Sequence, residues 1–208
     1  AANAVDIALT DAQARIEAAY ANGSTILHLN GATTLKSLDR VQGLSQLEGL
    51  NLHACIKLTD LGALRGLKQL KWLKLHSCIR LTELSPLQEL PKLEWLSLND
   101  CRELTDIGPL RGMPQLKWLD FRGCEKIIDL SPLGDLSQLQ SLYFSGHIDM
   151  EPILISAGLT PRLSQQPPIQ SFSDLGPLRK LSHLQLLDLG AGTSVTDISP
   201  LAGLTGLR

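Results

Sequence analysis

Residues 96–116, LSLNDCRELTDIGPLRGMPQL, decide the fold because the same pattern returns along the chain at a fixed spacing of 23 residues. Each copy reads approximately L-x-L-x-x-C-x-x-L-T-D-L-x-P-L-x-x-L-x-x-L. A further copy begins at Leu187, out of step with the others. The leucines that open the regular copies are Leu27, Leu50, Leu73, Leu96, Leu119 and Leu142. A self-similar chain of this kind predicts a repeat architecture.

The pattern within each unit predicts its local structure. In Leu96-Ser97-Leu98, strand alternation turns both leucines into a core and the residue between them outward. Segments such as Asp129–Leu133 combine a cap-competent Asp or Ser with a proline suited to a first helical position, which predicts a short 3₁₀ turn. No unit can bury its leucines alone, so the units must stack. We therefore predict an α/β fold, a curved solenoid with a parallel sheet on its concave face and 3₁₀ turns on its convex face.

The two ends are expected to differ from the middle. Residues 1–24 are predicted to form an N-terminal capping segment with a helix over 10–22. Thr10-Asp11-Ala12-Gln13 has the form of a capping box, and Gly23 is well placed to end the helix. The apolar stripe of this helix consists of Ile16, Ala19 and Tyr20.

Residues 25–208 are predicted to form the solenoid itself, with about seven repeats. The last repeat stops at Arg208 before its strand, so we expect that further repeats or a cap follow it. An insertion at about residues 147–172, rich in proline, interrupts the register. It is either a loop or decayed repeat, or a binding flap that projects from one face.

The composition argues against several classes of partner. The chain has 208 residues, of which 45 are leucine, and a formal charge of −2 at pH 7. Its 19 basic and 21 acidic residues leave no net field to attract nucleic acid or an anionic membrane surface. The sequence contains no run of about 18 apolar residues, the length needed to span a bilayer. We therefore expect neither nucleic acid nor a membrane as partner.

The repeated pattern, with its L-x-L pair and its cysteine, resembles the leucine-rich repeat family. The similarity is to the short-repeat type of the bacterial internalins and of the protein-phosphatase regulatory subunit class. It covers about residues 25–208 apart from the interruption. The resemblance implies a right-handed solenoid and a protein-binding scaffold, although a fold alone does not fix a function.

All cysteines occupy one repeat position, five residues after the first leucine of each strand: Cys55, Cys78, Cys101 and Cys124. Leucine-rich repeats usually place asparagine or cysteine there, where a small buried side chain bonds to the neighbouring backbone. Parallel side chains stacked about 5 Å apart do not converge on a metal or pair as disulfides. We therefore predict a structural ladder, no metal site and a reducing compartment, the cytoplasm. Because the chain begins Ala1-Ala2-Asn3 without methionine, removal of a secretion signal is the alternative.

Enzymatic motifs are missing from the sequence. No paired carboxylate, P-loop or glycine-rich dinucleotide motif lies on a suitable strand and helix, and the histidines form no triad with a nucleophile. We expect no enzyme and no cofactor. One column of alternating charge is expected to favour correct stacking of the repeats, and it consists of Glu48, Lys71, Glu94 and Lys117.

The exposed strand positions carry the functional signal. Trp72, Trp95 and Trp118, all the tryptophans of the chain, directly precede the first leucine of three successive strands. With strands about 4.8 Å apart, we predict a ladder of indoles about 10 Å long on the open face, continued by Tyr143. The other open-face positions of these strands are Lys74, His76, Ser97, Asn99, Asp120 and Arg122.

Large apolar side chains grouped on an open surface tend to mark interaction sites, and tryptophan is enriched at binding hot spots. The primary hypothesis is a non-enzymatic module that binds a protein or peptide on its concave face. Two alternatives stay open: a glycan or small ligand stacking on the indoles, or a sensor or substrate-docking segment of a larger multidomain protein. In a further alternative the rings only pack on each other and shield the sheet.

Overall fold

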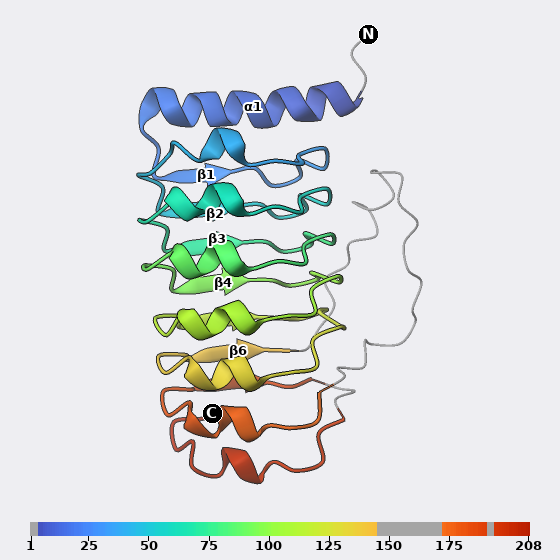
Figure 1. Cartoon of the computed structure of the whole chain (residues 1–208), viewed down its shortest axis with the longest axis vertical. Helices are drawn as coiled ribbons and strands as arrows, with labels where there is room; N and C mark the ends of the chain where they lie inside the picture. Colours follow the sequence, from blue (N-terminus) through green and yellow to red (C-terminus); the bar gives the residue numbers. More distant parts are fainter. Residues whose placement is uncertain (1–3, 145–171, 191–193) are drawn as a thin grey trace.

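The computed structural model describes residues 4–144, 172–190 and 194–208 of the chain. One helix, α1 (Ala4–Asn22), precedes a stack of short strands, each followed by a 3₁₀ turn (Figure 1). The strands are β1 (Ile26–His28), β2 (Gly49–Asn51), β3 (Trp72–Lys74), β4 (Trp95–Ser97), β5 (Trp118–Asp120), β6 (Ser141–Tyr143) and β7 (Leu186–Asp188). The 3₁₀ turns are η1 (Asp39–Val41), η2 (Gly62–Gly66), η3 (Ser85–Glu89), η4 (Gly108–Gly112), η5 (Ser131–Asp135), η6 (Gly176–Lys180) and η7 (Ser199–Leu201).

The strands form one parallel sheet in sequence order, which confirms the predicted repeat register. The first leucine of each unit lies opposite that of the next, as Leu73 lies opposite Leu96 and Leu96 opposite Leu119. Each strand is only 3 residues long, so it turns one leucine inward between two side chains on the open face. The stacked units therefore place equivalent residues in columns along the sheet.

The core of the stack lies between the sheet and the 3₁₀ turns and consists mainly of leucine. The central leucines Leu73, Leu96 and Leu119 are all fully buried. Where the second leucine of the pair is replaced by phenylalanine, the rings continue the column: Phe121 stacks on Phe144 at 5.8 Å between ring centroids. Each repeat thus buries its apolar face against its neighbours, which is how a stack of individually unstable units becomes stable.

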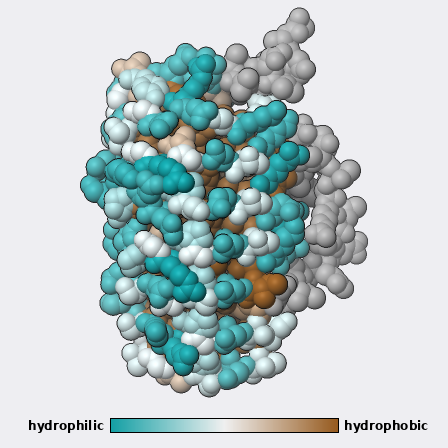
Figure 2. Space-filling model, in the orientation of Figure 1, coloured by the Kyte–Doolittle hydropathy of each residue, from teal (hydrophilic) through white to brown (hydrophobic). Residues whose placement is uncertain are grey.

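The 3₁₀ turns follow from the predicted Asp and Pro signals. The carboxylate of Asp129 accepts a hydrogen bond from the backbone N–H of Ser131 at 2.8 Å, and Asp106 does the same for Gly108 at 2.7 Å. Pro132 lies in the first turn of η5, where a missing N–H costs no hydrogen bond. The side of the molecule seen in Figure 2 is largely hydrophilic.

The N-terminal helix differs in extent from the prediction. It begins at Ala4 rather than residue 10, because Ala4, Ala8 and Leu9 are good helix formers and the proposed capping box becomes helix interior. Ile16 and Ala19 are buried against the first repeat, as expected for a cap. Tyr20 is not part of the buried stripe: it is 49% exposed, and its hydroxyl donates a hydrogen bond to the carbonyl oxygen of Arg40.

The insertion expected at residues 147–172 lies outside the described residues apart from Phe172, and so does His147. Phe172 is buried and its ring contacts Phe144 at 4.6 Å. Strands β6 and β7 pair directly, with Leu142 opposite Leu187, so the sheet continues in register on the two sides of this segment. The leucine core is less completely buried toward the C-terminal end, where Leu187 is only partly buried.

Candidate functional site: the aromatic face of the sheet

Strand pairing brings the three tryptophans into one row on the open face of the sheet. Trp72 lies opposite Trp95, and Trp95 lies opposite Trp118. The indoles of Trp95 and Trp118 stack nearly parallel, with centroids 4.1 Å apart and planes 11° apart. Tyr143 tilts against Trp118 at 5.3 Å. All four rings are only partly buried, so the row presents some apolar surface to solvent.

The row is not the continuous ladder that the sequence predicted. The indole of Trp72 leans away from Trp95 and lies over Gly49 of β2, where a side-chain carbon would meet ring atoms at 2.1 to 2.4 Å. On its far side the ring approaches His28 at 6.2 Å. Because Gly49 has no side chain, it leaves space for the indole that any other residue would occupy. Within the predicted ladder, Trp95 and Trp118 therefore stack on each other, whereas Trp72 lies apart from them.

The displaced ring leaves an open depression of about 550 Å³ between Trp72 and Trp95. One face of Trp95 is covered by Trp118, while Lys74 holds its ammonium 5.5 Å from the Trp95 ring centroid. A cation at this distance from an indole is attracted by the π-system. The depression is lined by His28, Lys71, Trp72, Lys74, Glu94 and Trp95.

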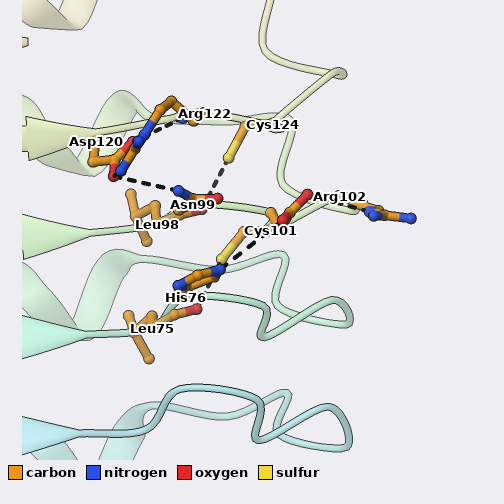
Figure 3. A network of polar contacts seen from close by, with 10 residues as sticks. Leu75, His76, Leu98, Asn99, Cys101, Arg102, Asp120, Arg122 and Cys124 are labelled. Atoms are coloured by element: carbon orange, nitrogen blue, oxygen red, sulfur yellow. Dashed lines mark hydrogen bonds and ion pairs between the residues drawn. The ribbon is translucent and has the colours of Figure 1, made fainter. Parts of the chain in front are cut away.

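Three of the predicted open-face residues are buried rather than exposed. Ser97 is 5% exposed, and Asn99 and Asp120 are each 1% exposed. Arg122 folds back over Asp120, and its Nε and Nη2 donate to the two oxygens of Asp120 at 2.9 and 2.6 Å (Figure 3). The amide nitrogen of Asn99 reaches Asp120 at 3.4 Å. The hydrogen bonds that Arg122 donates to Asp120 raise the pKa of Arg122, which keeps the guanidinium charged.

His76 and His53 occupy one column on the strand face, and their rings stack on each other. His53 and His76 lie with ring centroids 4.3 Å apart. Burial lowers the pKa of His53, and it lowers that of His76 to about 4, helped by the neighbouring His53. Both imidazoles are therefore neutral at pH 7. The charged groups that act on His76 are Lys74, Asp120 and Arg122, and Asp100 lies 4.0 Å from its Nε2.

The depressed pKa of His76 makes stability depend on pH in a defined window. Between pH 6.5 and about 4 the unfolded chain binds a proton at His76 that the folded chain does not bind. The free energy of unfolding should therefore fall as pH decreases through this window, by about 2 kcal/mol for His76. Thermal melts of the wild type and of His76→Gln at pH 7 and pH 4.5 measure this. The fall in melting temperature from pH 7 to pH 4.5 should be smaller in the variant than in the wild type. An equal fall in both proteins would contradict the role assigned to His76.

The four cysteines form a buried column beside this face, and Figure 3 shows two of them, Cys101 and Cys124. Each thiol donates to a backbone carbonyl oxygen of the preceding repeat, from Cys124 to Leu98 at 3.0 Å and from Cys101 to Leu75 at 3.3 Å. Burial raises the pKa of all four thiols, that of Cys55 to about 12. The thiolate is the form of cysteine that reacts and binds metals. Because these side chains stay protonated, they serve as buried hydrogen-bond donors that link neighbouring repeats.

Within the described ranges, no group of three or more His, Cys, Asp or Glu side chains is arranged to hold a metal ion. In the same residues, no helix has the length and apolar character needed to cross a bilayer.

The charge column beside the tryptophans is paired in two separate halves. Lys71 bonds to Glu48 at 2.9 Å, and Lys117 bonds to Glu94 at 2.9 Å. The predicted alternation is therefore present, and the break between Lys71 and Glu94 coincides with the depression between Trp72 and Trp95. Exposed pairs of this kind contribute little, about 0 to 1 kcal/mol each.

Sequence reasoning missed Gly49 as part of this face. The signal for Gly49 was present, because it occupies in β2 the position that tryptophan occupies in the next three strands. It went unused because a glycine offers no contact of its own. Its role becomes visible only from the side chain that fills its space.

No protein-family model matches the chain, and no curated protein matches it by sequence. Solved structures match its fold. An internalin C2 from Listeria monocytogenes has a TM-score of 0.66 at 23% identity, covering 96% of this chain and 90% of that protein. The internalin inlF of the same organism has a TM-score of 0.50 at 20% identity, covering 97% and 80%. A leucine-rich repeat protein of Leptospira interrogans has a TM-score of 0.50 at 17% identity, covering 83% and 45%.

Proposed function

We propose that this chain, which has the leucine-rich repeat fold, is a non-enzymatic binding module that takes a protein or peptide on the open face of its sheet. The observation that carries the proposal is the row of partly buried rings formed by Trp72, Trp95, Trp118 and Tyr143. Aromatic side chains held on a rigid sheet lose little conformational freedom on binding and bury a large area. Such a surface favours an interaction site over simple shielding.

The charges around the rings favour a protein surface over a polyanion. Arg122 is neutralised by Asp120, and Lys71 and Lys117 are neutralised by glutamates. The face therefore offers apolar area with few uncompensated charges, whereas binding to a nucleic acid backbone needs many cations. The rim of polar side chains around an apolar centre is the usual anatomy of a protein interface.

A peptide selection tests this proposal without knowledge of the natural partner. Random peptides displayed on phage are selected against the intact chain, and enriched sequences are measured by isothermal titration calorimetry. We expect ligands that bind the wild type and Ile128→Ala equally, since Ile128 is an exposed apolar residue outside the strands. Selection of no peptide, together with saturable binding of an oligosaccharide that changes tryptophan fluorescence, would support glycan binding instead. Peptides that bind only elsewhere on the molecule would contradict the proposal.

A further inference from the structure

The depression between Trp72 and Trp95 exists because of one residue on the neighbouring strand. Gly49 leaves room for the Trp72 indole, which would otherwise lie above its own strand, closer to Trp95. Trp95 and Trp118, in the same row, are in van der Waals contact. The sequence therefore opens one gap in a row of rings that are otherwise able to stack. We call this gap, with its six lining residues given above, the indole slot.

The indole slot is shaped for a flat apolar group. Trp118 covers one face of Trp95, so the other face is the one turned to the slot and to Lys74. An aromatic ring entering the slot would stack on Trp95 and meet the edge or face of Trp72. Aromatic pairs of this kind gain attraction beyond the area that they bury.

The charged side chains that line the slot favour an occupant with a negative charge. Lys71 and Glu94 each form a salt bridge away from the slot, with Glu48 and Lys117. Lys74 forms no salt bridge with any residue that the structure describes, and its ammonium lies over Trp95. The slot therefore combines an apolar floor with one uncompensated positive charge. A group that pairs a ring with a carboxylate complements both features.

We propose that the indole slot binds an aromatic side chain of the partner that stands next to an acidic residue in the partner's sequence. The ring stacks on Trp95, and the neighbouring carboxylate pairs with Lys74. This inference rests on the proposed function and refines it, because it states which part of a protein partner lies at this end of the aromatic row.

The test uses two small probes with the same ring and opposite charge, 3-phenylpropionate and 2-phenylethylamine. Because the chain has 3 tryptophans, its indole N–H groups give three signals in a ¹⁵N-correlated NMR spectrum, assigned by single Trp→Phe variants. We expect 3-phenylpropionate to shift the signals of Trp72 and Trp95 more than that of Trp118. Its dissociation constant should lie in the millimolar range, and 2-phenylethylamine should bind at least fivefold more weakly.

Two variants separate the slot from its surroundings. Gly49→Val should push the Trp72 indole toward Trp95, close the slot and weaken 3-phenylpropionate binding at least tenfold. Ser141→Val places the same side chain at the same strand position outside the slot and should leave binding unchanged. Lys74→Gln should remove the preference between the two probes while the fold, followed by circular dichroism, stays the same.

The outcomes distinguish this inference from the proposed function. Suppose that peptides are selected, and that Gly49→Val binds these peptides and 3-phenylpropionate as tightly as the wild type does. The slot proposal then fails and the broader function stands. Equal binding of the two probes, or equal shifts of all three indole signals, would also overturn the slot proposal. If no peptide is selected while 3-phenylpropionate binds in the slot, the slot takes a small ligand and the proposed function fails.

Discussion

Replacing Cys101 with glutamine is expected to lower the free energy of unfolding by about 4 kcal/mol, because a larger amide enters a filled and fully buried position. Cys101 is 0% exposed, and its thiol donates to the carbonyl oxygen of Leu75. The amide would have to displace neighbouring leucines and would leave at least one polar atom without a partner. Urea denaturation followed by circular dichroism measures the loss.

The matched control is Cys101→Ala, which removes the thiol hydrogen bond without adding volume. It should cost about 1 kcal/mol, the usual contribution of one hydrogen bond. Comparable losses in the two variants would show that the column tolerates bulk, contrary to a close-packed ladder. Peptide binding by the folded fraction of either variant should be unchanged, since neither substitution touches the open face.

Trp95→Ala is expected to have the opposite profile, with a large effect on binding and a small one on folding. Trp95 is the central rung, covered by Trp118 on one side and facing the indole slot on the other. Removing the indole should weaken the binding of a selected peptide by about 30-fold, equivalent to about 2 kcal/mol or more. Loss of one exposed stacking contact should cost about 1 kcal/mol of stability.

Calorimetric titration of Trp95→Ala measures the loss of affinity, and thermal melting of the same variant measures the loss of stability. Trp95→Phe serves as the matched variant, because it keeps a ring in the row and should retain more of the affinity. A large fall in melting temperature with unchanged affinity would show that the rings shield the sheet rather than bind a partner.

The fold was predictable because it depends on a repeated pattern rather than on single residues. Seven copies of the repeat fix the strands, five with an L-x-L pair and two with phenylalanine in place of the second leucine. The alternation of strand side chains fixes which face is buried. The Asp and Pro positions predicted the 3₁₀ turns for the same reason. The N-terminal helix lies outside the repeat, and there a local capping signal at Thr10 was outweighed by helix-forming residues before it.

The site was predictable only in outline. Strand register placed Trp72, Trp95 and Trp118 in one row, but side-chain directions depend on the space left by neighbours. Gly49 redirects Trp72, and this effect crosses from one repeat to another, so no pattern within a repeat reveals it. The burial of Asp120 likewise depends on the long side chain of Arg122 folding back over it.

The central claim is that a partner binds on the aromatic row of the open face. The most direct measurement is calorimetric titration of a selected peptide into the triple variant Trp72→Ala, Trp95→Ala and Trp118→Ala, with circular dichroism showing that the sheet is retained. We expect no detectable binding by this variant and full binding by Ile128→Ala. Wild-type affinity in the folded triple variant would contradict this claim.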